Sequence, residues 1–263
     1  MRVRGTTVLL TGATGGIGHA VAREFARRGA RLVLTGRRVA ELDGLAAEVG
    51  GRAVVADLAS ADGVRRLAEE VGPVDVLVAN AALPASGALL DLAEEQVRRA
   101  LAVNLEAPIA LAHALAPSMV AARRGHVVFV GSLAGKVASP YSSLYNATKF
   151  GLRGFALGLR EDLRGSGVGV SIVQPGFVRD AGMFAGTGAR PPAGMRTVSP
   201  EQVAVGVVGA IEGDRAEVNV APPELRVASA LGGAFPAFSS GLQRRLANED
   251  LMRRLSAANR DKR

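Results

Sequence analysis

The N-terminal segment predicts a strand, a glycine-rich turn, a helix and a second strand in immediate succession. Thr6–Thr11 (TTVLLT) is a short apolar run rich in strand-forming residues. It leads into Gly12–Gly18 (GATGGIG), after which an amphipathic helical pattern runs to Gly29, and Arg31–Thr35 is typical of the next strand. This order of elements is the context that a dinucleotide-binding turn requires.

The glycines of this turn suit a backbone that approaches a phosphate closely. Gly12 permits the tight turn, whereas Gly16 and Gly18 let the backbone approach a pyrophosphate and let the helix pack on the strand. The helix that follows offers free N–H groups and the positive end of its dipole to phosphate oxygens. We therefore predict a phosphate cradle at Gly12–Gly18; a glycine turn without a ligand is the alternative.

Strand and helix patterns alternate along the rest of the chain. The further predicted strands are Arg52–Ala56, Val74–Ala79, Gly125–Gly131, Val168–Gln174 and Glu217–Val220. The predicted helices are Val39–Val49, Ala61–Val71, Glu94–Ala122, Ser143–Arg164 and Pro200–Ile211. This alternation predicts an α/β fold, a doubly wound parallel sheet of about seven strands (Rossmann type) with helices on both faces. We expect the 263 residues to form one domain.

Tyr145 and Lys149 are four residues apart in a predicted helix, so they lie about one turn apart on one face. A phenol has an ordinary pKa near 10, and a neighbouring ammonium lowers that pKa. We expect Tyr145 to exchange a proton with a carbonyl or alcohol oxygen, and Ser132 to hydrogen-bond the same oxygen. The other tyrosine, Tyr141, has no basic residue four positions further on. A helix that carries Tyr and Lys by chance is the alternative.

The glycine spacing is Thr-Gly-x-x-x-Gly-x-Gly, beginning at Thr11, and it differs from the common G-x-G-x-x-G. Together with Ser132, Tyr145 and Lys149, this pattern resembles the short-chain dehydrogenase/reductase family. The resemblance extends from about Thr6 to Val220. Further family motifs follow in order, at Asp57-Leu58, Ala79-Asn80-Ala81-Ala82, Asn104 and Pro175-Gly176.

The resemblance implies reversible hydride transfer between a nicotinamide and a substrate carbonyl or carbinol carbon. By it, Ser132 and Tyr145 bind and protonate the substrate oxygen, and Lys149 holds the nicotinamide ribose and lowers the Tyr145 pKa. Asn104 would hold a water that links Lys149 to bulk solvent. The implied cofactor contacts are Gly12, Thr14, Gly15, Gly16, Ile17, Gly18, Asp57, Leu58, Asn80, Ala81, Tyr145, Lys149, Pro175, Gly176 and Val178.

The end of the second strand indicates NADP rather than NAD. NAD-selective folds commonly place an acidic residue there to bind the ribose hydroxyls, and Gly36 occupies that position. Arg37 and Arg38 are placed to meet a 2′-phosphate through charge-assisted hydrogen bonds. Two arginines that cap the next helix or face water are the alternative.

Two features depart from the family pattern. Asp180 stands where a Thr is common, and we expect it to turn away from the phosphates and to cap a short helix over 181–185. Ala79 and Ala82 replace the usual Asn and Gly of the fourth-strand motif. The resemblance also implies a substrate lid over 179–198, where Met183, Phe184 and Met195 favour an apolar substrate; a surface loop is the alternative.

The C-terminal extension, 221–263, bears on the choice of substrate. β-Ketoacyl-carrier-protein reductases usually stop soon after the last strand, whereas here about forty residues follow Val220. The apolar stretch Leu225–Leu242 is expected to cover the pocket or a dimer face. This favours an NADP(H)-dependent carbonyl reductase or alcohol dehydrogenase that acts on a lipophilic small molecule. A β-ketoacyl-carrier-protein or acyl-CoA reductase is the alternative, and a non-catalytic dinucleotide sensor is the second.

Charge and composition restrict the partners. The net charge is +8, but there is no Trp and no recognisable basic motif, so we expect no nucleic-acid partner. With no cysteine, no signal-peptide layout and no apolar run long enough for a bilayer, we expect a cytoplasmic protein without a metal site. The resemblance implies a homodimer or homotetramer. Peripheral membrane contact is left open for the basic tail, namely Arg244, Arg245, Arg253, Arg254, Arg260, Lys262 and Arg263.

Overall fold

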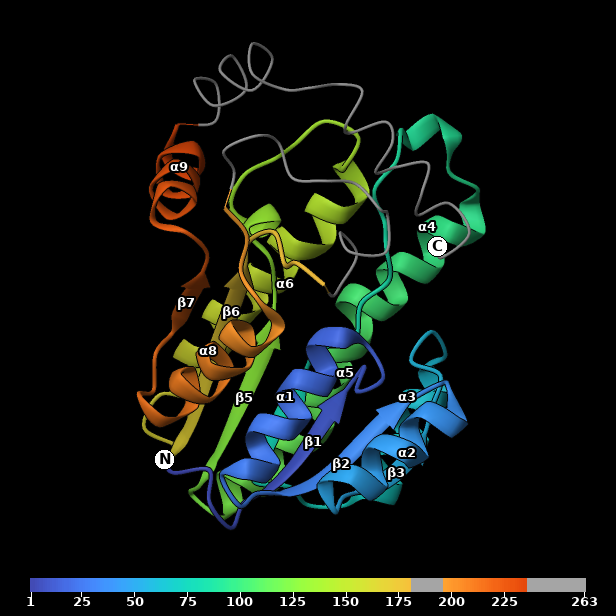
Figure 1. Ribbon diagram of the computed structural model, residues 1–263, viewed down its shortest axis with the longest axis vertical. Helices are drawn as coiled ribbons and strands as arrows, with labels where there is room; N and C mark the ends of the chain where they lie inside the picture. The colour runs from blue at the N-terminus through green and yellow to red at the C-terminus, as the bar shows by residue number, and fades with distance from the viewer. Residues whose placement is uncertain (181–195, 236–263) are drawn as a thin grey trace.

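The computed structural model describes residues 1–180 and 196–235. These residues form a seven-stranded sheet with helices packed on it (Figure 1). The strand order is β3-β2-β1-β4-β5-β6-β7, and every neighbouring pair is parallel. The strands are β1 (Thr7–Thr11), β2 (Arg31–Gly36), β3 (Arg52–Val55), β4 (Val76–Ala79), β5 (Gly125–Val130), β6 (Val168–Pro175) and β7 (Glu217–Val220). The predicted doubly wound parallel sheet is confirmed.

Helices cover both faces of the sheet. One layer contains α1 (Gly16–Arg27), α2 (Val39–Val49) and α8 (Pro200–Glu212). The opposite layer contains α3 (Ala61–Val71), α5 (Ala107–Ala121) and α6 (Ser143–Asp162). The remaining elements are η1 (Leu89–Asp91), α4 (Glu94–Leu101), η2 (Ala102–Glu106), η3 (Leu133–Gly135) and α9 (Pro223–Ala234).

The central strands are mostly apolar because both faces of the sheet are covered by helices. All six residues of β5 are buried. Val128 and Val130 join the core under α1 and α8, whereas Val127 and Phe129 join the core under α5 and α6. This alternation is the two-residue period of a strand, which supplies two cores from one run of sequence.

The helix predicted over Glu94–Ala122 forms as one continuous run, Glu94–Ala121, but the prediction missed a π-helical turn in its middle. The chain forms α4, a π-helical turn η2 and then α5. Pro108, at the start of α5, has no N–H to donate to the carbonyl of Asn104, and a wider turn accommodates the missing bond. The π turn therefore falls where the sequence placed a candidate catalytic residue, Asn104.

The same run, Glu94–Ala121, is long and apolar enough to cross a membrane by length and composition, which the sequence analysis did not expect. Half of its most apolar stretch is buried in the fold. Leu111, Leu115 and Met119 pack into the core against the sheet. Its apolar character is thus accounted for by core packing.

A buried histidine lies near the amino ends of the strands, at the opposite end of the sheet from the glycine turn. His126 on β5 is 2% exposed, and its Nε2 lies 2.8 Å from Ser171 Oγ. Ser171 donates its proton to the carbonyl of Arg215 at 2.6 Å, so His126 donates through Nε2–H. Gly169 leaves room for this ring, because a Cβ there would lie 2.4 Å from Nδ1. Burial lowers the pKa of His126 to about 4.

We expect His126 to make the fold sensitive to mild acid. The unfolded imidazole has a pKa near 6.5, so between about pH 6.5 and 4 the unfolded state binds more protons and stability falls as the pH falls. The expected loss between pH 7 and pH 5 is about 2 kcal/mol. Urea denaturation at pH 7, 6 and 5 measures it, with His126→Gln as the reference. Equal losses in both proteins would assign the effect to other groups.

Candidate active site

The turn from β1 into α1 is built so closely that side chains are excluded at two glycines. Gly12 has φ +64°, and a Cβ there would lie 2.7 Å from the Cα of Ala81. A Cβ at Gly18 would lie 2.2 Å from the carbonyl oxygen of Gly12. Helix α1 begins at Gly16 without a side-chain cap and without an acidic residue in its first turn. Its N-terminus therefore presents free N–H groups and a positive dipole end to an anion.

Asn80 and Thr11 hold this turn against the end of β4. The Asn80 side-chain amide donates to the carbonyls of Thr11 and Gly12 at 3.0 and 3.1 Å. Thr11 Oγ1 accepts from the backbone N–H groups of Asn80 and Ala81, both at 3.0 Å. The structure thus uses Asn80 and Ala81 to join neighbouring strand ends, which fixes the turn for ligand binding.

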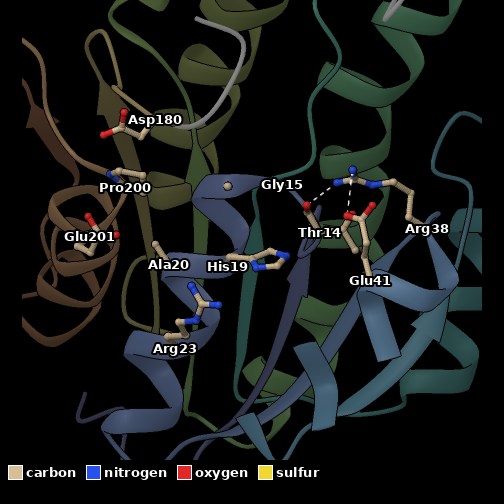
Figure 2. Close-up of a pocket in the computed structure, with 11 residues that line it drawn as sticks. Thr14, Gly15, His19, Ala20, Arg23, Arg38, Glu41, Asp180, Pro200 and Glu201 are labelled. Atoms are coloured by element: carbon tan, nitrogen blue, oxygen red, sulfur yellow. Dashed lines mark hydrogen bonds and ion pairs between the residues drawn. The ribbon is translucent and has the colours of Figure 1, made fainter. Parts of the chain in front are cut away.

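A hollow of about 530 Å³ adjoins the glycine turn, between the N-termini of α1 and α8 (Figure 2). It is lined by Thr14, Gly15, Gly16, His19, Ala20, Arg23, Arg38, Glu41, Asp180, Pro200 and Glu201. Arg38 donates to the carbonyl of Thr14 and forms an ion pair with Glu41 at 2.9 Å. This guanidinium is therefore held beside the predicted phosphate cradle.

The residues of this region fit a dinucleotide phosphate. The cradle excludes Cβ atoms, the first turn of α1 contains no acidic residue, and Arg38 supplies a cation. Sequence reasoning missed His19 and Arg23, which line the same hollow. Their spacing of four along α1, beginning three residues after Gly16, was the available signal.

The other predicted cofactor residues lie at neighbouring strand ends. Gly176 follows β6 and donates to the carbonyl of Val220 at 3.0 Å, and Val178 is buried and bridges to Val198. The Asp57 carboxylate is exposed and accepts from the N–H of Ala59 at 3.1 Å. Pro175 is the last residue of β6. Among the other predicted cofactor contacts, Leu58 is buried, Ile17 is half-buried and Arg37 is exposed.

Ser132, Tyr145 and Lys149 converge at the carboxyl ends of the central strands. Ser132 follows β5 and caps η3, where its Oγ accepts from the N–H of Ala134 at 3.1 Å. A hydrogen bond joins the Ser132 and Tyr145 side chains. Lys149 Nζ lies 5.8 Å from the centre of the Tyr145 ring, one helical turn along α6. Residues that are distant in sequence thus form one polar cluster.

The expected lowering of the Tyr145 pKa by Lys149 is not what the structure shows. Burial raises the pKa of Tyr145 to about 12, and the hydrogen bond to Ser132 opposes the rise. Lys149 is 2% exposed, and burial lowers its pKa to about 8. Its Nζ donates to the carbonyl of Val130 at 3.1 Å and lies over the ring face. Desolvation therefore dominates the pKa of both groups.

Residues 6–191 match the family model of the short chain dehydrogenases. The chain belongs to the short-chain dehydrogenase family. It is 34% identical to the ketoacyl reductase HetN of Nostoc sp., and the match covers 82% of this chain and 78% of that protein. It is also 34% identical to mouse dehydrogenase/reductase SDR family member 7B, over 67% of this chain. This short-chain dehydrogenase spans only 58% of the length of that relative.

Solved structures agree with the family assignment. The short-chain dehydrogenase from Sphingobium yanoikuyae in complex with NADPH superposes with a TM-score of 0.78 at 28% sequence identity. The match covers 89% of this chain and 95% of that one. This likeness supports the arrangement of sheet and helix layers described above.

In this short-chain dehydrogenase, Asn104 lies in the π-helical turn and is 1% exposed. Its Oδ1 accepts from the N–H of Leu83 at 2.6 Å, and its Nδ2 donates to the carbonyl of Leu83 at 3.0 Å. The side chain thus ties η2 to the segment after β4. Its water-holding role stays a prediction.

Asn146 is a site residue that sequence reasoning missed, although it stands directly after Tyr145. It is 5% exposed. Its amide donates to the carbonyls of Ala134 and Val137 at 2.6 and 3.0 Å and accepts from the N–H of Ser139 at 3.2 Å. The segment after Ser132 is thereby held against α6. No local pattern revealed this, because its partners are seven to twelve residues away in a loop.

The lid predicted over 179–198 lies mostly outside the described residues, as do the cap proposed for 181–185 and residues Met183, Phe184 and Met195. Asp180 itself is exposed, has φ +60°, and pairs with Arg179 at 3.8 Å. Asp180 lines the same hollow as Gly15 and Gly16 (Figure 2). Its expected turn away from the phosphates stays a prediction.

Proposed function

We propose that this short-chain dehydrogenase is an NADP(H)-dependent oxidoreductase that interconverts a ketone or aldehyde with an alcohol on a lipophilic small molecule. The observation that carries the proposal is the hydrogen-bonded pair Ser132–Tyr145, one helical turn from Lys149. The pair lies at the same edge of the parallel sheet as the glycine turn, because both follow carboxyl ends of central strands.

The bound nicotinamide would supply the hydride for the carbonyl carbon. In the reduction, the Tyr145 phenol transfers its proton to the carbonyl oxygen, and the Ser132 hydroxyl donates a hydrogen bond to that oxygen. A pKa of about 12 keeps Tyr145 protonated at neutral pH, which is the form that donates. The Lys149 ammonium then stabilises the phenolate that remains. In the oxidation, the same groups act in reverse.

An apolar wall beside Tyr145 supports a lipophilic substrate. Tyr145 packs against a cluster that contains Ala85, Ala100 and Leu144, with Leu92 and Val97 at its margin. Leu225 of α9 lies near Gly176, which directly follows β6. Apolar surface around a few polar groups is the usual composition of a small-molecule pocket.

We expect Arg38 to set the preference for NADP over NAD. A charge-assisted contact to the 2′-phosphate contributes about 1.5–3 kcal/mol, so Arg38→Gln is expected to lower kcat/KM for NADPH by about tenfold to a hundredfold. The value for NADH should change by less than about threefold. Arg37→Gln is the matched control, because Arg37 does not line the hollow. Equal losses with both cofactors would contradict the assignment.

A β-ketoacyl thioester is the second candidate substrate, favoured by the similarity to the Nostoc ketoacyl reductase. The test of both is NADPH oxidation with a panel of aliphatic ketones, aromatic ketones and β-ketoacyl thioesters. Highest kcat/KM on free ketones supports the first proposal, and highest kcat/KM on thioesters supports the second. NADPH binding without turnover anywhere in the panel would support the non-catalytic sensor.

A further inference from the structure

We propose that Glu217, on the edge strand β7, is a positioning residue that holds the Ser132 turn against the helix that carries Tyr145 and Lys149. Its carboxylate bonds to Lys136 Nζ through Oε1, and Oε2 accepts from Arg153 Nε at 2.7 Å. The proposal rests on the proposed function, because it assigns Glu217 a part in the same chemistry.

Each partner of Glu217 belongs to one half of the catalytic cluster. Lys136 follows η3 directly, and two turn hydrogen bonds connect it to Ser132. The N–H of Lys136 donates to the carbonyl of Leu133 at 2.9 Å, and the N–H of Gly135 donates to the carbonyl of Ser132 at 2.8 Å. Arg153 stands one helical turn beyond Lys149 on α6. A single carboxylate therefore connects the element of the serine to the element of the tyrosine and lysine.

At Gly135 the two elements approach too closely for a side chain to fit between them. A Cβ at Gly135 would lie 2.7 Å from the carbonyl oxygen of Lys149, so η3 and α6 approach through their backbones. Asn146 fixes the later part of the segment, at Ala134, Val137 and Ser139. Glu217 adds a second attachment, from the strand side.

Burial makes this attachment firm. The side chains of Lys136 and Glu217 are 12% and 17% exposed, and that of Arg153 is 34% exposed. Burial raises the pKa of Glu217, but the hydrogen bonds from Lys136 and Arg153 more than offset it, so the pKa lies below its ordinary value. The carboxylate stays ionised at neutral pH, and Asn219 gives Lys136 a further acceptor at 3.3 Å.

A double-mutant cycle between Glu217→Gln and Ser132→Ala tests the proposal. We expect Glu217→Gln to lower kcat about tenfold while the Kd for NADPH, read from NADPH fluorescence, changes less than about twofold. Ser132→Ala should cost about a hundredfold in the wild type and only about tenfold in the Glu217→Gln background, because a displaced serine contributes less. The same factor in both backgrounds would overturn the proposal.

Glu212→Gln is the matched control, since Glu212 forms a comparable ion pair with Arg28 at 2.9 Å on the opposite helix layer. It should leave kcat and the Ser132→Ala factor unchanged. If Glu217→Gln does not fold, Glu217→Asp keeps the charge and shortens its reach. In that case a kcat equal to the wild type overturns the proposal, and a reduced kcat at constant NADPH affinity supports it.

Hydrogen exchange of residues 132–137 separates this proposal from the proposed function. We expect faster exchange in Glu217→Gln than in the wild type and in Glu212→Gln, and equal exchange in all three overturns the positioning role. A wild-type protein without turnover on any carbonyl compound would refute the proposed function. The exchange result would still show whether Glu217 holds the segment 132–137 in place.

Discussion

Replacing Tyr145 by phenylalanine is expected to lower kcat for carbonyl reduction by about 10³-fold, because the proton donor is removed and water is a poor substitute in a half-buried site. The ring keeps its packing against the apolar cluster of Leu92, Val97 and Leu144. The Kd for NADPH should therefore stay within about twofold, since phosphate binding lies elsewhere. Steady-state rates of NADPH oxidation and a fluorescence titration measure the two quantities.

Tyr141→Phe is the matched control, because it removes the hydroxyl of the other tyrosine in the chain. It should keep kcat within about threefold of the wild type. A Tyr145→Phe protein with near-normal kcat would eliminate the proposed mechanism, and an equal loss in Tyr141→Phe would move the proton donor to the other tyrosine.

Replacing Lys149 by methionine is expected to abolish turnover and, at the same time, to stabilise the fold. Holding a charged amine in a site that lowers its pKa from 10.5 to about 8 costs about 3 kcal/mol at neutral pH. Methionine removes that cost and forfeits the hydrogen bond to Val130, worth about 1 kcal/mol. The net gain is on the order of 2 kcal/mol, or about 5 °C in Tm.

The pH dependence of this gain is its own control. The Lys149 pKa is lower in the folded state, so the unfolded state binds more protons between about pH 8 and 10.5, and wild-type stability rises with pH across that window. The stability advantage of Lys149→Met should therefore shrink between pH 8 and pH 10, as measured by urea denaturation. A constant advantage, or a variant less stable than the wild type at pH 7, would contradict the assignment.

The fold was predictable because its signals are local. The alternation of β1, α1 and β2 follows from the strand run, the glycine turn and the amphipathic pattern, and each needs only neighbouring residues. The π turn within Glu94–Ala122 was missed even though Pro108 is plain in the sequence. Proline near a helix start is common, so only the packed structure shows that a π turn absorbs the missing bond here.

The residues that lie together in the candidate site were predictable from the sequence, whereas the pKa of Tyr145 was not. Spacing alone placed Tyr145 beside Lys149, and strand ends that share one sheet edge brought Ser132 to them. The nearby charge of Lys149, taken alone, predicted a lowered pKa for Tyr145. Burial reverses the sign, and burial depends on Leu92, Val97 and other residues that are far away along the chain.

By itself, the sequence of this short-chain dehydrogenase determined the order of the strands and helices along the chain, the close glycine turn and the candidate members of the site. Periodicity, turn chemistry and fixed spacing act over a few residues, which is why one chain suffices to predict them. The tertiary structure alone decided which groups are desolvated, that Asn146 and Glu217 hold the serine turn, and that His126 is buried neutral. These depend on contacts between distant segments, and the free energy of a charge or a hydrogen bond is set by what surrounds it after the chain has folded.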